Sequence, residues 1–278
     1  MDDKAFSSID FVGQCLTDSE RSKAFDTAIT SVVKPTHNVL DVGTGSGIMA
    51  LFAARAGAQK VTAIEFDPYV AEIARNTFRA NNFNNIELLI EDARTVTVKD
   101  GEKYDVVIME MLTTGMVDEF QVQAVNNLHK QKAVDESTIF IPSTHETFAT
   151  LMDVDYTCYG LKMPMVIHLW KWHDWSHMRQ DAISNEAVLN TVSFEKPIEE
   201  KFDQVIDFKI EKDGIINTIY LSSKSHLLDR LILGNTESLN APMVVPIAEQ
   251  KVSKGDIIKV HIKYIFGGGY KNFSAEII

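Results

Sequence analysis

The sequence predicts an α/β fold in two parts: a doubly wound α/β domain over residues 1–142 and an antiparallel, β-barrel-like domain over residues 143–278. Up to about residue 141, short apolar runs alternate with helical patterns, which is typical of βαβ units and a mainly parallel sheet. After Pro142 the apolar period shifts toward two, which favours antiparallel strands. A chain of 278 residues, 45% of them hydrophobic, is long enough for both domains.

The first half begins with a helix, because Thr17 and Glu20 have the spacing of a capping box, and the pattern continues to about Ser31. Asp67-Pro68 starts another helix, since the missing N–H of proline costs nothing in a first turn. The other expected elements are strands at 38–42, 61–65, 86–90 and 104–109 and helices at 48–56 and 116–128.

The second half contains two predicted hairpins. Phe208 and Ile210 alternate with charged residues before the turn Asp213-Gly214, and a returning strand is expected at 215–221. Residues 258–266 alternate in the same way, and three glycines at 267–269 then permit a reversal into 270–278. No repeat or flexible linker separates the halves, so we expect the two domains to pack closely.

Composition excludes several classes of partner. Twenty-seven basic against thirty-nine acidic side chains give a formal charge of −12, which repels nucleic acid and attracts cations. No apolar stretch approaches the roughly 18 residues of a membrane span, and the acidic N-terminus is unlike a secretory signal. We therefore expect a cytoplasmic protein without membrane contact. Cys15 and Cys158 lie far apart, which suggests neither a disulfide framework nor a cysteine zinc site.

A glycine loop follows the first predicted strand. Gly43, Gly45 and Gly47 would let the backbone approach a ligand closely and adopt positive φ. Position 48 is Ile, where a dinucleotide-binding G-x-G-x-x-G motif would place its third glycine, so a pyrophosphate ligand is disfavoured. Asp41, just before the loop, would repel a phosphate but suits a cofactor that carries an ammonium and a sulfonium.

Two further acidic positions follow the next two strands. Glu65, 24 residues after Asp41, can accept both ribose hydroxyls of a nucleoside. Asp92, followed by Ala93, can accept a hydrogen bond from an adenine amino group. The alternative is a tight turn with three solvated carboxylates at strand ends.

Together these residues resemble the class I methyltransferases, which have a Rossmann-like domain and use S-adenosyl-L-methionine, and the resemblance covers roughly residues 15–141. The segment from Met109 to Glu119 resembles the double-glutamate loop of the protein arginine N-methyltransferases, with Glu110 and Glu119 at the same separation. The domain order is also similar. The resemblance implies that Arg21, in the segment LTDSER, binds the cofactor carboxylate. It further implies cofactor binding by Asp41, Gly43, Gly45, Gly47, Glu65, Asp92 and Ala93, and catalytic roles for Glu110 and Glu119.

The expected acceptor is a guanidinium nitrogen, in arginine of a protein or peptide or in a small guanidino compound. A guanidinium is planar and permanently charged, and carboxylates can hold its fork of donors in bidentate fashion. Two rival functions stay open: methylation of an unrelated amine or hydroxyl with Glu110 as general base, and a non-catalytic binding protein. Glu119 and the neighbouring Asp118 could also be acidic only because they start a helix.

Two other segments bear on the function. The family's Thr-His-Trp segment corresponds here to residues 238–242, SLNAP, so its histidine is missing and the proton acceptor is unassigned. His173 and His177 have i, i+4 spacing, but Trp170 and Trp172 alternate as a strand would, so we expect no metal there. We expect this aromatic segment to form a domain or subunit contact or a wall of the substrate groove, and a homodimer is a further expected partner.

Overall fold

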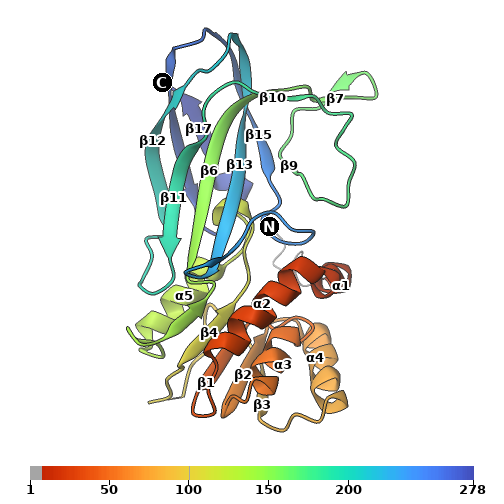
Figure 1. Ribbon diagram of the computed structural model, residues 1–278. Helices are drawn as coiled ribbons and strands as arrows, with labels where there is room; N and C mark the ends of the chain where they lie inside the picture. Colours follow the sequence, from red (N-terminus) through yellow and green to blue (C-terminus); the bar gives the residue numbers. More distant parts are fainter. Residues whose placement is uncertain (1–7, 100) are drawn as a thin grey trace.

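The computed structural model describes residues 8–99 and 101–278, and a parallel sheet organises the first half of the chain (Figure 1). Its strand order is β3-β2-β1-β4-β5, and every neighbouring pair is parallel. The order reverses between β1 and β4, and ligands of open α/β sheets bind beyond the strand ends at such a reversal. The strands are β1 (Asn38–Val42), β2 (Lys60–Glu65), β3 (Ile86–Ile90), β4 (Val106–Met109) and β5 (Ile139–Ile141). The predicted doubly wound α/β class is confirmed.

The helices begin where capping residues place them, with one shift. Asp18, and not Thr17, caps α2, because its side chain accepts a hydrogen bond from the Arg21 N–H at 3.0 Å. Thr17 instead ends a helix that the sequence analysis did not predict. Asp67 caps the helix that begins at Pro68, as predicted. The helices are α1 (Ile9–Thr17), α2 (Ser19–Val32), α3 (Ile48–Arg55), α4 (Pro68–Ala80) and α5 (Gln121–Lys130).

The predicted start of the last of these helices, at residue 116, is wrong. A short 3₁₀ turn, η1 (Thr114–Met116), is followed by irregular backbone, and α5 begins only at Gln121. Gly115 and Met116 have φ values of 73° and 51°, which an α-helix cannot include. Asp118 and Glu119 therefore lie in a loop. The preference of first helical turns for acidic residues does not explain why these two residues are acidic.

Antiparallel sheets form the second half, as predicted. One sheet has the strand order β10-β6-β13-β15-β9, with β11 beside β6 and β14 beside β13; another has the order β12-β16-β17, and β7 and β8 form a small pair. The strands are β6 (Thr144–Val154), β7 (Thr157–Cys158), β8 (Leu161–Lys162), β9 (Ile167–His168), β10 (Gln180–Ala182), β11 (Ala187–Ser193), β12 (Lys201–Lys209), β13 (Gly214–Leu228), β14 (Leu231–Leu233), β15 (Met243–Val252), β16 (Ile257–Ile265) and β17 (Ser274–Ile277).

The first predicted hairpin is wrong, and the second is confirmed. β12 pairs with β16, whereas β13 pairs with β6 and β15, so the turn Asp213-Gly214 joins two different sheets. Alternation specifies which face of a strand is buried but does not name its partner. At the C-terminus β16 pairs with β17, with Lys263 opposite Ser274, and a short 3₁₀ turn, η2 (Tyr270–Asn272), lies between them.

The two halves share one hydrophobic core, as expected from the absence of a linker. The glycine-rich segment before η2 packs on the loop that precedes α5: the Gly267 N–H donates to the Met116 carbonyl at 3.0 Å and the Gly269 N–H to the Val117 carbonyl at 2.8 Å. The second half thereby fixes the loop that carries Asp118 and Glu119. Within the described residues, no helix combines the length and the apolar character that a membrane crossing requires.

Candidate active site

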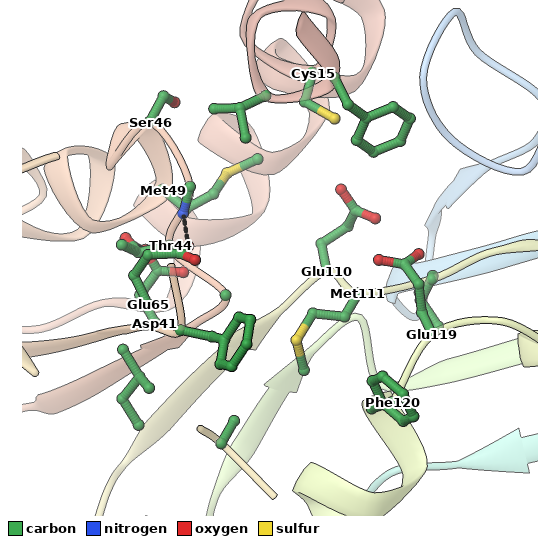
Figure 2. A pocket seen from close by; sticks show the side chains of 18 of the residues that line it. Cys15, Asp41, Thr44, Ser46, Met49, Glu65, Glu110, Met111, Glu119 and Phe120 are labelled. Atoms are coloured by element: carbon green, nitrogen blue, oxygen red, sulfur yellow. Dashed lines mark hydrogen bonds between the residues drawn. The ribbon is translucent and has the colours of Figure 1, made fainter. Parts of the chain in front are cut away.

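A pocket lies at the carboxyl ends of the parallel strands, beside the reversal between β1 and β4 (Figure 2). Asp41 and Glu65 lie on one side of it, and Glu110 and Glu119 lie together on the other, as Figure 2 shows. All the predicted site residues but one line this pocket: Arg21, Asp41, Gly43, Gly45, Glu65, Asp92, Ala93, Glu110 and Glu119.

Gly47 is the exception, and the structure places it at the start of α3. Its φ is 85°, and a Cβ atom there would lie 2.5 Å from Cε1 of Phe78. Gly43 and Gly45, with φ values of 72° and 53°, face the pocket itself. Gly47 is thus required by packing against α4, while the other two glycines keep the pocket wall free of side chains.

Asp41 is buried at the end of β1 and is 2% exposed. Its Oδ2 accepts a hydrogen bond from the Thr44 hydroxyl. Burial raises the pKa of this carboxyl from 3.8 to about 6, and the Thr44 hydrogen bond opposes that shift. A carboxylate so poorly solvated is suited to a cationic ligand group.

Glu65 is held by backbone donors on both oxygens. Its Oε2 accepts from the Gly45 N–H and its Oε1 from the Asp67 N–H, both at 2.9 Å. Burial raises the pKa of Glu65, against the effect of these hydrogen bonds. Each carboxylate oxygen can accept more than one hydrogen bond, so the fixed side chain keeps capacity for ligand hydroxyls.

Asp92 has a partner that the sequence analysis did not foresee. The Arg94 Nε lies 2.9 Å from both Asp92 carboxylate oxygens, and Nη2 lies 2.6 Å from Oδ2. This pairing lowers the pKa of Asp92. The Arg94 guanidinium also lies over the ring of Phe120, 4.1 Å from its centroid. Arg94 therefore links Asp92, which follows β3, to Phe120, which follows Glu119.

Arg21 and Glu110 form a buried ion pair. The Arg21 Nε lies 2.6 Å from Glu110 Oε2, Nη2 donates to the same oxygen, and Nη1 donates to the Cys15 carbonyl at 3.1 Å. The two side chains are 7% and 9% exposed. Burial raises the pKa of Glu110, and the positive charge of Arg21 opposes this shift. The residue predicted to bind the cofactor thus contacts a residue predicted to bind the acceptor.

Glu119 has an unusual electrostatic environment. Burial and the nearby carboxylates of Glu110 and Asp118 raise its pKa well above the ordinary value, and Arg21 only partly opposes them. Asp118 also lines the pocket, and neither of its carboxylate oxygens has a hydrogen-bond partner in the part of the chain that the structure describes. Three carboxylates therefore gather at this end of the pocket around one arginine, which favours a cationic ligand.

Two residues of α1 line the pocket, and neither was predicted as a site residue. Phe11 and Cys15 both line it, and the Ser8 side chain caps this helix. The serine before an apolar periodic run was the available signal. Asp118 was also missed, because its position beside Glu119 was ascribed to a helix start.

Ser238 begins the segment 238–242, which was expected to correspond to the Thr-His-Trp segment of the protein arginine N-methyltransferases. Its backbone N–H and its hydroxyl both donate to Asp18 Oδ2, at 2.8 and 2.9 Å, and the Thr236 hydroxyl donates to the same oxygen. Because Asp18 also caps α2, this segment of the second half orients the helix that carries Arg21.

The tryptophan segment consists of turns and not of the expected strand. Trp170 stacks between His168 and Trp172, with ring centroids 5.7 and 4.6 Å away, and meets the Phe11 ring of α1 edge-on at 5.8 Å. It therefore connects the second half to the helix that covers the pocket. Among the residues described, no group of His, Cys, Asp and Glu side chains could hold a metal ion.

The residues present fit S-adenosylmethionine. Asp41 is a buried carboxylate suited to a cation, Glu65 retains acceptor capacity, and Gly43 and Gly45 leave room for close backbone contact. Residues 25–155 match the family described as ribosomal protein L11 methyltransferase (PrmA).

Comparison with known proteins extends the likeness to the whole chain. An uncharacterized protein of Methanocaldococcus jannaschii is 35% identical over 264 residues, covering 94% of each chain. An arginine N(omega)-methyltransferase of Streptomyces achromogenes is 33% identical over 143 residues, covering 50% of this chain and 39% of its own. The fold resembles that in a Trypanosoma brucei PRMT1 enzyme-prozyme complex with AdoHcy, with a TM-score of 0.75, 16% identity and coverage of 99% and 98%. The chain belongs to the same family as the Methanocaldococcus jannaschii protein and is a class I methyltransferase that uses S-adenosylmethionine.

Proposed function

We propose that the protein transfers a methyl group to a guanidinium nitrogen, in arginine of a protein or peptide or in a small guanidino compound. The observation that carries this proposal is the pair of pocket carboxylates, Glu110 and Glu119, that share one end of the pocket. Glu110 contacts the guanidinium of Arg21, and this contact supports the fit of its carboxylate to such a group. The Streptomyces relative is named for methylation of arginine, and the matching PrmA family for a ribosomal protein.

The cofactor, when bound, supplies an electrophilic methyl group. Under the proposal Asp41 faces its cationic portion, Glu65 its ribose hydroxyls and Asp92 its adenine, while Gly43, Gly45 and Ala93 form the wall beside it and Gly47 holds the loop. Arg21 binds the cofactor carboxylate while it remains beside Glu110.

Glu110 and Glu119 act on the acceptor. Two carboxylates on a planar cation fix its plane and so orient one nitrogen, which supplies proximity. They also draw positive charge away from that nitrogen and favour its attack on the methyl carbon. The raised pKa of Glu119 makes it the better placed of the two to take up the proton that the nitrogen loses.

The test is transfer of label from methyl-tritiated S-adenosylmethionine to four acceptors assayed separately: L-arginine, an arginine-containing peptide, a total protein fraction and a small-metabolite fraction. Glu119→Gln should lower turnover of the guanidino acceptor by about 10²-fold or more. Glu195→Gln, an exposed site far along the chain, is the matched control and should leave turnover unchanged.

Other outcomes would support the rivals. If Glu119→Gln leaves transfer intact and the label lies in an amine or hydroxyl compound, the acceptor is a different small molecule. If calorimetry shows cofactor binding but no fraction takes up label, the protein is a binding protein without transferase activity.

We further propose that the protein forms a homodimer through the segment between β6 and β10. Large apolar side chains are exposed there, and Figure 1 shows the segment projecting beside the main sheets. Contiguous exposed apolar surface favours association. Replacing Leu161 and Met165 together by Glu should convert the dimer to a monomer in light scattering coupled to size-exclusion chromatography. A wild-type monomer at micromolar concentration would contradict this proposal. The exposed large apolar residues of this segment are Tyr159, Leu161, Met163, Met165 and Trp172.

A further inference from the structure

Asp118 is a buried carboxylate at the pocket. Its side chain is 1% exposed, it lines the pocket, and it directly precedes Glu119. Among the described residues, neither Oδ1 nor Oδ2 has a hydrogen-bond partner. Burial of an ionised carboxylate is costly unless another charge compensates it. The surroundings of Asp118 should therefore contain a compensating group.

His168 is the group that approaches it. Its Nε2 lies 3.4 Å from Asp118 Oδ2, within ion-pair distance although not in hydrogen-bond geometry. The ring stacks on Trp170, nearly parallel at 6°, and faces Tyr270 edge-on at 6.3 Å. These contacts fix the imidazole against Asp118. The His168 side chain is 23% exposed.

Two further titratable side chains, Cys15 and Tyr270, lie near Glu119 and Asp118. Burial raises the pKa of Cys15 to about 12 and that of Tyr270 well above its ordinary value, so both side chains are neutral at working pH. Among the described residues, the ionisable side chains that then remain beside Glu119 or Asp118 are Arg21, Glu110 and His168, together with Asp118 and Glu119 themselves. Arg21 is engaged by Glu110. Asp118 is thus a negative neighbour of Glu119, and His168 is the group within ion-pair distance that can compensate its charge.

We propose that Asp118 and His168 together set the ionisation of Glu119 and are positioning residues of the acceptor site. This inference rests on the proposed role of Glu119 in holding the acceptor. A cationic imidazole at this position would neutralise Asp118 and so favour the ionised form of Glu119, which can bind a cation. Without that countercharge, the negative charge of Asp118 favours the protonated form of Glu119.

The test follows the titration of Glu119 directly, by the carbon-13 chemical shift of its carboxyl group in the ligand-free protein, assigned with Glu119→Gln. Asp118→Asn removes a negative neighbour and should lower the Glu119 midpoint by about one pH unit. His168→Gln removes the countercharge and should raise the midpoint. His173→Gln, an exposed histidine of the same segment, is the control and should leave it unchanged.

If Asp118 and His168 had only a structural role, their substitutions would not move the Glu119 midpoint in opposite directions. The proposal is overturned if Asp118→Asn leaves the midpoint in place, or if both variants shift it the same way. His168→Gln keeps the test decisive should Asp118→Asn fail to fold, since an unchanged midpoint in that variant also overturns the proposal. The measurement needs no acceptor, so it separates this inference from the guanidinium assignment, which the label-transfer assay tests. With an accepted substrate, the acidic limb of kcat/KM should shift in the same directions.

Discussion

Asp41 links ligand binding to stability at the scale of one residue. Its pKa is about 6 in the folded protein against an ordinary value of 3.8, so folding favours the protonated form. The folded state binds more protons than the unfolded state between these values, and the free energy of unfolding therefore falls as pH rises through this window. At neutral pH the ligand-free protein contains a carboxylate that lowers its stability.

Asp41→Asn should consequently raise the free energy of unfolding of the ligand-free protein at pH 7, by on the order of 1 to 3 kcal/mol. The gain should shrink toward zero as pH falls to about 4. The same variant should weaken binding of S-adenosylmethionine. Chemical denaturation at several pH values and calorimetry would measure the two effects. A gain that does not depend on pH would contradict the electrostatic explanation.

The Arg21 and Glu110 pair leads to a second prediction at this scale. Arg21→Met leaves a buried carboxylate without its cation and should lower the free energy of unfolding by about 3 kcal/mol. Adding Glu110→Gln should restore part of this loss, because the orphaned charge is removed. A double-mutant cycle in chemical denaturation measures the coupling. Additive losses from the two single variants would show that the pair contributes no specific interaction.

At the scale of elements, the sequence correctly predicted those helices, strands and turns that are determined by residues close together in the chain. The strands from β1 to β4, the cap of α4 and the C-terminal hairpin follow from apolar runs, Asp67-Pro68 and the glycine segment. The pairing of β12 with β16 could not be predicted, because a strand's alternation is the same whichever neighbour it meets. The beginning of α5 was missed because the left-handed Met116 gives no compositional signal.

The turn into α3 depends on Gly47, the residue directly before this helix. Gly47→Ala should cost both the strain of positive φ and the contact of the new Cβ with Phe78. Gly57→Ala is the matched control, since Gly57 has φ of 96° and a Cβ there would have no atom of the described residues within 4 Å. The control should lose about 1 kcal/mol of stability, and Gly47→Ala clearly more. Equal losses in chemical denaturation would show that Phe78 adapts freely.

At the scale of the whole molecule, the site belongs to both halves of the chain. Motif spacing together with the family resemblance predicted nine residues that line the pocket. Most of them follow strands whose ends meet at one edge of the sheet, whereas Arg21 lies in α2 and was predicted from the resemblance alone. Spacing and resemblance were insufficient for Ser238 and His168, which reach the site from strands and turns of the second half. Contacts between residues so distant in sequence depend on the packing of the two halves.

That shared packing predicts a single cooperative unfolding transition. One hydrophobic core runs through both halves, and hydrogen bonds cross between them, including the Gln123 Nε2 to the Phe266 carbonyl at 2.6 Å. Neither half can lose its structure without exposing apolar surface of the other, so the calorimetric and van't Hoff enthalpies should agree. Asp18→Ala, which removes three hydrogen bonds from Thr236 and Ser238, should lower the transition temperature without splitting the transition. Two resolved transitions in the wild-type protein would mean that the halves fold independently, and the loop before α5 could then not owe its conformation to the glycines at 267 and 269.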